Sequence, residues 1–125
     1  MRPSKAAALQ QFMESFGMAA YTTASVPEDV IFPYLTYELI TGAFDMGEVS
    51  INVNLWFYTE SEAIPNAKVQ QISERIGPGG LTVPCEGGAI WIKRGSPFAQ
   101  SLRDDAAPNL KRRYINLDVE YFTAN

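Results

Sequence analysis

Residues 48–58 read EVSINVNLWFY, in which apolar side chains occupy every second position. A period of two predicts a β-strand, because successive side chains of a strand point to opposite faces. One face is wholly apolar and consists of Val49, Ile51, Val53, Leu55 and Phe57. The other face runs from serine and asparagine at one end to Trp56 and Tyr58 at the other. We expect that second face to be partly covered.

Further strands are expected on both sides of this segment in the sequence. Their side chains are β-branched and aromatic, and glycine, proline and polar residues separate them. The expected strands are residues 34–41, 81–84, 89–93 and 111–123, with two shorter extended pieces at 20–24 and 98–102. Residues 34–41 and 48–58 would pair antiparallel, and residues 81–84 and 89–93 would form a hairpin.

Two helices complete the pattern. Residues 4–16 place apolar side chains at helical spacing and end before Gly17, and residues 61–76 do the same before the Gly77-Pro78-Gly79-Gly80 run. The chain therefore predicts one α+β domain over residues 1–125, with two helices packed on one face of a mostly antiparallel four- to five-stranded sheet. The hairpin between the second helix and the last strand argues against a doubly wound parallel sheet.

Composition narrows the classes of function. The 125 residues include ten lysines and arginines against fourteen aspartates and glutamates, for a net charge of -4, so the chain as a whole does not attract nucleic acid or an anionic membrane. No histidine is present, which excludes Ser-His-Asp and Cys-His nucleophiles and histidine-liganded zinc. A single cysteine, Cys85, can form no internal disulfide. No apolar run approaches the ~20 residues of a membrane span, so we expect a soluble, cytosolic chain.

No group of residues predicts a catalytic or ligand site. Residues 77–80 follow a helix instead of preceding one, so they suit a helix stop better than a phosphate loop. Cys85 lies at an expected turn with no base nearby in the sequence, which favours an inert thiol. Three carboxylate pairs lie in expected loops or at helix starts, without the ligand spacing of a Ca²⁺ loop. We therefore expect them to be solvated surface residues rather than catalytic or Ca²⁺-binding ones; they are Glu28-Asp29, Glu60/Glu62 and Asp104-Asp105. We expect no enzymatic activity, no metal and no cofactor.

Basic and aromatic side chains are the candidates for an interface. Lys93-Arg94 and Lys111-Arg112-Arg113 carry half of the positive charge, either as solvated strand ends or as contacts with a neighbouring subunit or DNA phosphate. Aromatic residues exceed what one small core can hide, because several lie on opposite faces of the same strands. The candidate interface residues are Trp56, Tyr58, Trp91, Lys93, Arg94, Phe98, Arg112 and Arg113.

Five segments occur in an order and spacing that suggest a family. They are FPYLTY at 32–37, NLWFY at 54–58, the helix at 66–76, GAIWIKRGSPFAQ at 88–100 and RRYINL at 112–117. Together they resemble the tail terminator, or tail completion, proteins among the minor tail proteins of long-tailed phages and prophages. The likeness covers residues 28–124 and rests on order and spacing, because each segment alone is short and largely hydrophobic.

The resemblance implies a small α+β subunit that assembles into a homo-oligomeric ring, commonly a hexamer, at the end of the tail tube. Such a ring stops polymerisation of the tube protein and provides the surface that docks to the head connector protein. Genome DNA passes through its central hole without sequence recognition. The implied location is the tail of the virion at the head-tail junction, and the cytoplasm of the bacterial host before assembly.

Other interpretations stay open. One is a head-tail joining or connector protein of a prophage, and another is an unrelated small binding domain. An RNA-binding sheet is disfavoured, because the polar face of the last strand carries Asp118 and Glu120, whose carboxylates oppose phosphate. For the same electrostatic reason, we expect Arg94, Arg112 and Arg113 to bind acidic groups of a neighbouring subunit or tail protein rather than DNA. We expect the ring to be built from strand edges and aromatic side chains.

Overall fold

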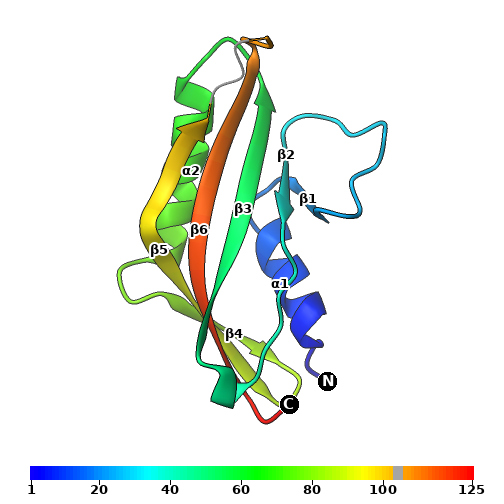
Figure 1. The fold of residues 1–125 in the computed structure, drawn as a ribbon, viewed down its shortest axis with the longest axis vertical. Helices are drawn as coiled ribbons and strands as arrows, with labels where there is room; N and C mark the ends of the chain where they lie inside the picture. The colour runs from blue at the N-terminus through cyan, green and yellow to red at the C-terminus, as the bar shows by residue number, and fades with distance from the viewer. Residues whose placement is uncertain (103–105) are drawn as a thin grey trace.

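The computed structural model describes residues 1–102 and 106–125. Two helices and six strands follow one another along the chain (Figure 1). In order they are α1 (Lys5–Glu14), β1 (Ala19–Thr22), β2 (Tyr34–Tyr37), the short 3₁₀ helix η1 (Phe44–Met46), β3 (Glu48–Tyr58), α2 (Ala63–Ile76), β4 (Leu81–Cys85), β5 (Gly88–Leu102) and β6 (Leu110–Thr123). Neither α1 nor α2, the helices of the described residues, is long and apolar enough to cross a membrane.

The six strands form one mixed sheet in the order β1-β2-β3-β6-β5-β4. β1 pairs with β2 in parallel, and the other four pairings are antiparallel. The prediction of a mostly antiparallel sheet of four to five strands was therefore wrong: the sheet is six-stranded, mixed and curved into a half-barrel. The α+β class agrees with the structure. The prediction failed at β1, because four residues with two alanines carry too little pattern to separate a strand from an extended loop.

β5 is also longer than expected. Residues 89–93 and 98–102, taken from the sequence as separate pieces, belong to one strand of 15 residues, which pairs with β6 from Gly88 to Arg94 and again from Ala99 to Leu102. The pairing shifts register between Arg94 and Ala99, where the Gly95-Ser96-Pro97 segment lies. Glycine and proline at a bulge are compatible with a continuous strand. The break in the sequence pattern therefore marks an irregularity inside β5 and not its end.

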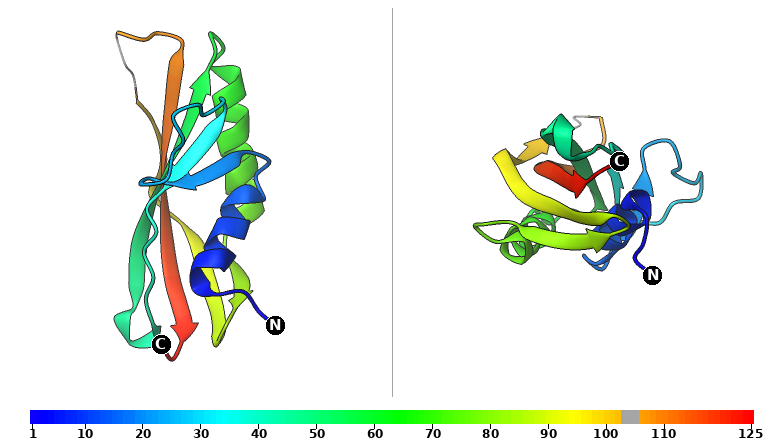
Figure 2. Two further views of the ribbon diagram at one scale, coloured as in Figure 1. Left: turned by 90° about the vertical axis from the view of Figure 1, so that its right-hand side faces the viewer. Right: turned by 90° about the horizontal axis from the view of Figure 1, so that it is seen from below.

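Both helices lie on the same side of the sheet (Figure 2). α2 packs against β5 and β6, whereas α1 contacts β1 and β4, the two edge strands. α1 therefore occupies the opening of the half-barrel, between strands that are at opposite ends of the sheet order. Its first turn is capped by Ser4, whose hydroxyl accepts a hydrogen bond from the Ala7 backbone N–H at 3.1 Å.

The core fills the space between the helices and the inner face of the sheet. The alternation of β3 continues in β6, so each strand supplies one row of buried side chains. Across the β3–β6 pairing these rows lie side by side, with Ile51 opposite Leu117 and Val53 opposite Ile115. The helices add Leu9, Phe12, Met13, Ile72 and Ile76. Burial of this one continuous cluster is the main stabilising contribution to the fold.

Gly95 provides a test of this packing. A Cβ at residue 95 would lie 2.8 Å from both the Cβ and the backbone oxygen of Asn116 on β6, closer than real Cβ atoms approach. We expect Gly95→Ala to lower the free energy of unfolding by ~1–3 kcal/mol in urea titrations, since β5 must move away from β6. Gly79→Ala is the control, because nothing lies within 4 Å of a Cβ there. An equal effect of both substitutions would contradict the close approach.

Candidate functional site

The side of the sheet opposite α1 and α2 is covered by neither of these helices (Figure 2). We call it the outer face. It consists of every second residue of β3 and β6, from Glu48 to Tyr58 and from Leu110 to Phe122, together with Tyr34, Thr36, Trp91 and Lys93 on the neighbouring strands. These side chains are exposed or half-buried, except for Thr36. Among the described residues, the outer face is therefore a surface of the sheet that neither α1 nor α2 covers.

One end of the outer face is aromatic. Tyr34 and Trp56 are stacked with ring centroids 6.2 Å apart, and Phe32 packs at 5.2 Å from Tyr34 and 5.9 Å from Tyr58. The indole N–H of Trp56 donates to the Thr36 hydroxyl at 3.1 Å, which fixes the ring against β2. We call Phe32, Tyr34, Trp56 and Tyr58 the aromatic end. Its rings hold one another in place, yet Tyr58 remains 65% exposed.

Arg112 lies against this aromatic end. Its guanidinium carbon is 5.0 Å from the centroid of Trp56 and 6.0 Å from that of Tyr114, and its Nε donates to the Asn54 side-chain oxygen at 2.7 Å. The stacking positions the guanidinium plane and leaves its terminal nitrogens for other partners. Within residues 1–102 and 106–125, no carboxylate forms an ion pair with Arg112.

The opposite end of the outer face is acidic. Glu48 and Glu120 are paired across β3 and β6, and Lys93 on β5 donates to both, at 2.9 Å to Glu120. The hydrogen bonds to Glu48 and Glu120 raise the pKa of Lys93 above its ordinary value. Asp118 is the register partner of Lys93 and accepts a hydrogen bond from the Ser50 hydroxyl at 3.5 Å. We call Glu48, Lys93, Asp118 and Glu120 the acidic end, since it has three carboxylates and one ammonium.

Aromatic rings accompany the acidic end as well. The Lys93 ammonium lies 4.1 Å above the Trp91 ring, and Trp91 stacks on Phe122 at 6.2 Å. Phe44 of η1 adds a third ring, 6.2 Å from Phe122, and is 69% exposed. Between the two ends, the outer face carries the amides of Asn52, Asn54 and Asn116. The face is thus amphipathic along its length.

The structure divides the eight candidate interface residues between the two sides of the sheet. Trp56, Tyr58, Trp91, Lys93 and Arg112 lie together on the outer face. Arg94 is exposed on the helix side, where it donates to the Ser73 hydroxyl of α2 at 3.0 Å. Phe98 is half-buried and packs against the core. The outer-face carboxylates were not among the candidates, although the same alternation that singles out Trp56 places them on this face.

Arg113 lies on the inner side of the sheet. It is 4% exposed, and its guanidinium donates at 2.6 Å to Glu62, the N-cap residue of α2, and at 3.0 Å to Asn66 in the first turn of that helix. Lys111 lies 3.6 Å from the same Glu62 carboxylate. These contacts hold the start of α2 to β6. The guanidinium of Arg113 is therefore paired inside the chain, and we leave it out of the contact surfaces proposed below.

Cys85 and the carboxylate pairs noted in the sequence are the remaining reactive groups. Cys85 is fully buried, and burial raises the pKa of its thiol. In the part of the chain that the structure describes, no three acidic or cysteine side chains cluster as metal ligands would. The Asp104-Asp105 pair falls outside the described residues, and Glu62 of the Glu60/Glu62 pair is bound to Arg113.

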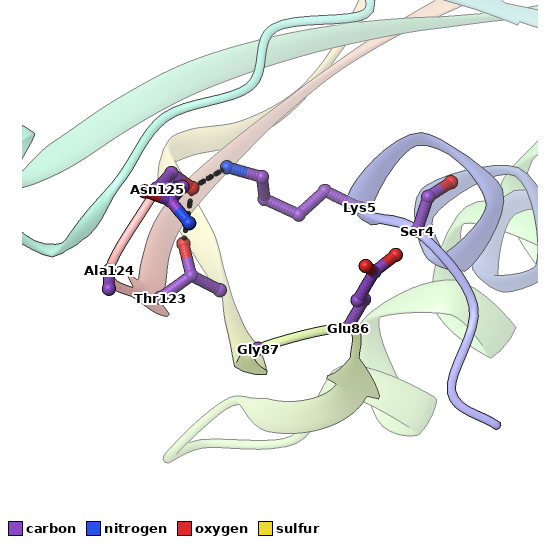
Figure 3. A pocket seen from close by; sticks show the side chains of 7 residues that line it. All are labelled: Ser4, Lys5, Glu86, Gly87, Thr123, Ala124 and Asn125. Carbon is purple, nitrogen blue, oxygen red and sulfur yellow. Dashed lines mark hydrogen bonds between the residues drawn. The ribbon is translucent and has the colours of Figure 1, made fainter.

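A hollow near the chain ends is shown in Figure 3. It is lined by Ser4, Lys5, Glu86, Gly87, Thr123, Ala124 and Asn125. The Lys5 ammonium donates to the backbone oxygens of Asn125 and, at 2.7 Å, of Gly42, and the Glu86 N–H donates to the Pro3 carbonyl at 2.6 Å. These bonds tie the segment before α1 to the β4–β5 turn and to the end of β6. We interpret the hollow as a structural junction.

Comparison with known proteins found no relative. No family model, no curated protein and no solved structure matches this chain. The functional argument therefore rests on the residues and geometry of the chain itself, with the outer face as its principal surface.

The Arg113–Glu62 pair predicts a pH dependence. The hydrogen bond and charge of Arg113 hold the pKa of Glu62 below its ordinary value of 4.5. A depressed carboxyl pKa stabilises the fold above 4.5, and this contribution is lost as the pH falls through the lowered value. Glu62→Gln should therefore flatten the loss of stability between pH 5 and pH 3, roughly the range in which carboxyls titrate, in urea titrations. Glu60→Gln is the control, and an unchanged acid slope in Glu62→Gln would contradict the pairing.

Burial of Cys85 predicts its reactivity. An aromatic disulfide reagent should modify the native thiol more than about tenfold more slowly than the urea-unfolded thiol, because both access and thiolate formation are suppressed in the fold. Absorbance of the released thiolate follows the reaction. Equal rates in the native and unfolded states would show that Cys85 is open to solvent.

Proposed function

We propose that this chain is a structural virion protein that caps the tail tube of a long-tailed phage or prophage as a homo-oligomeric ring. In this role the ring ends tube polymerisation and provides the surface to which the head connector docks. Genome DNA passes through the ring without sequence recognition. The chain would act by contact alone and catalyse no reaction.

The uncovered outer face is the observation that carries this proposal. A subunit that works by contact needs ordered aromatic and charged side chains outside its core, and the aromatic end and the acidic end supply both. The aromatic rings are fixed by stacking and by the Trp56–Thr36 hydrogen bond, so little side-chain freedom remains to be lost on binding. Order before binding distinguishes such a surface from scattered exposed hydrophobic residues.

Electrostatics support DNA passage over DNA binding. The net charge of -4 opposes retention of the duplex by the ring as a whole. Two of the basic side chains proposed from the sequence are bound to carboxylates of the chain: Lys93 to Glu48 and Glu120, and Arg113 to Glu62. They are therefore poor phosphate ligands. We expect the chain to let DNA pass without binding it tightly.

Arg94 is the residue proposed for ring closure. In a ring each subunit meets its neighbours through two different surfaces, and the helix side of the sheet can supply one of them. Arg94 is exposed on the helix side, at the start of the irregular segment of β5. Its side chain is already oriented by Ser73, and we propose that it binds an acidic group of the neighbouring subunit.

The assembly test measures mass and shape. Light scattering and negative-stain images of the purified chain should show a closed ring, either at high protein concentration or after addition of assembled tail tubes. The mass would then be a whole-number multiple, commonly sixfold, of 13.8 kDa. A chain that stays monomeric under both conditions contradicts the proposal.

Arg94→Glu should prevent ring closure while leaving the subunit folded. Charge reversal at a contact that excludes water costs ~2–5 kcal/mol, enough to open a ring. The same mass measurement and images of tails from induced cells, which should be over-long or headless, give the readout. Arg75→Glu, an exposed change on the same side of the molecule, should assemble normally. Normal assembly of Arg94→Glu with weaker duplex binding would instead place Arg94 in the channel.

A further inference from the structure

Two opposite charges on the outer face, those of Arg112 and Asp118, lack an ionic partner among residues 1–102 and 106–125. Arg112 binds the Asn54 amide and two aromatic rings, and Asp118 accepts a hydrogen bond from the Ser50 hydroxyl. Among the described residues, neither side chain takes part in an ion pair. Lys93 is the cation beside Asp118, but its ammonium is engaged by Glu48 and Glu120. Within the part of the chain that the structure describes, Arg112 is therefore a cation and Asp118 a carboxylate of the outer face without an ion pair.

These two charges cannot satisfy each other within one chain. Both residues belong to β6 and are six positions apart, an even number, so their side chains lie on the same face of the sheet. At ~3.4 Å per residue their backbones lie about 20 Å from each other, beyond the reach of the two side chains. A partner that satisfies both must therefore present a carboxylate opposite Arg112 and a cation opposite Asp118, at this same spacing.

A second copy of this chain meets that requirement. We propose that the outer face pairs with the outer face of another copy across a two-fold axis, with Arg112 of each copy bound to Asp118 of the other. In this arrangement the axis lies in the interface, perpendicular to the strands, so that β6 runs antiparallel over β6 of the second copy. A two-fold axis parallel to the strands would instead bring Arg112 against Arg112 and Asp118 against Asp118. Like-charge repulsion selects the first arrangement.

The rest of the outer face fits the same axis. The midpoint between Arg112 and Asp118 is residue 115, so Tyr114 of one copy lies over Asn116 of the other, with Asn52 and Asn54 on the adjacent strand. Amides carry both donors and acceptors and can pair with their own kind. The aromatic end of each copy then lies over the acidic end of the other, which covers rings such as Tyr58. Sheets packed face to face in this way lie about 10 Å apart.

This pairing is independent of the proposed ring. It uses a two-fold axis and the outer face, whereas the contact proposed for ring closure is that of Arg94 on the helix side. A dimer has twice the 13.8 kDa mass of one chain, and a sixfold ring does not depend on the Arg112–Asp118 contact. The two proposals can therefore succeed or fail separately.

A charge-swap cycle tests the pairing. Sedimentation velocity over a concentration series should show a dimer for the native chain. We expect Arg112→Glu and Asp118→Arg each to raise the dimer dissociation constant about 30-fold or more, because each brings like charges together at two symmetric positions. The double variant, Arg112→Glu with Asp118→Arg, restores opposite charges across the axis and should recover most of the affinity. The unfolding midpoint of each variant checks that the Trp56 contact of Arg112 is not needed for folding.

Charge reversals away from the outer face are the controls. Arg75→Glu and Glu74→Arg, both exposed on α2, should leave the dimer unchanged. A native chain that is monomeric at millimolar concentration overturns the pairing. So does a dimer that survives both single reversals, or a double variant that is no tighter than either single one. A sixfold ring that persists in variants whose face-to-face dimer is lost supports the pairing and leaves the proposed function standing, because ring closure does not use the Arg112–Asp118 contact.

Discussion

The register between β3 and β6 is the constraint on which the rest of the molecule depends. Eleven residues of β3, from Glu48 to Tyr58, pair with β6 without interruption. Because side chains alternate, this register aligns the buried rows of the two strands and also fixes the order of groups on the outer face. A slip by one residue would turn every apolar side chain of β3 toward solvent, so the core holds the outer face in place.

That register carries an electrostatic cost, which a third strand offsets. Glu48 and Glu120 face each other directly across β3 and β6, and like charges in such a pair are destabilising. Lys93 comes from β5 and donates to both carboxylates while lying over Trp91. The acidic end is therefore a network of three strands. Its ammonium is unavailable to Asp118, and this is why a free carboxylate remains on the surface.

Adjacent arginines show how strand geometry separates roles. Arg112 and Arg113 are neighbours in sequence, yet they emerge on opposite faces of β6. Arg113 points to the helices and is bound by Glu62 and Asn66, whereas Arg112 lies on the aromatic rings of the outer face.

The two edge strands of the sheet, β1 and β4, are both contacted by α1. In β4, Pro84 also lacks a backbone N–H that could pair with another strand.

The sequence by itself determined the local elements and the face to which each side chain belongs. Alternation in residues 48–58 and 111–123 predicted β3 and β6, and helical spacing predicted α1 and α2 to within two residues at their ends. Arg113 is two positions from Ile115, so the same alternation places Arg113 on the buried side of β6. These features depend on neighbours in the chain, so a single sequence carries them.

Tertiary structure alone decided which strands pair and which charged side chains find partners within the chain. The parallel pairing of β1 with β2, the continuity of β5 across Gly95 and the position of α1 between the sheet edges follow from packing of residues far apart in sequence. The same holds for Lys93, which reaches Glu48 across 45 positions of the chain, and for Arg112, which meets Trp56. The physical reason is that strand order and register are set by burial of the whole core, which no local pattern encodes.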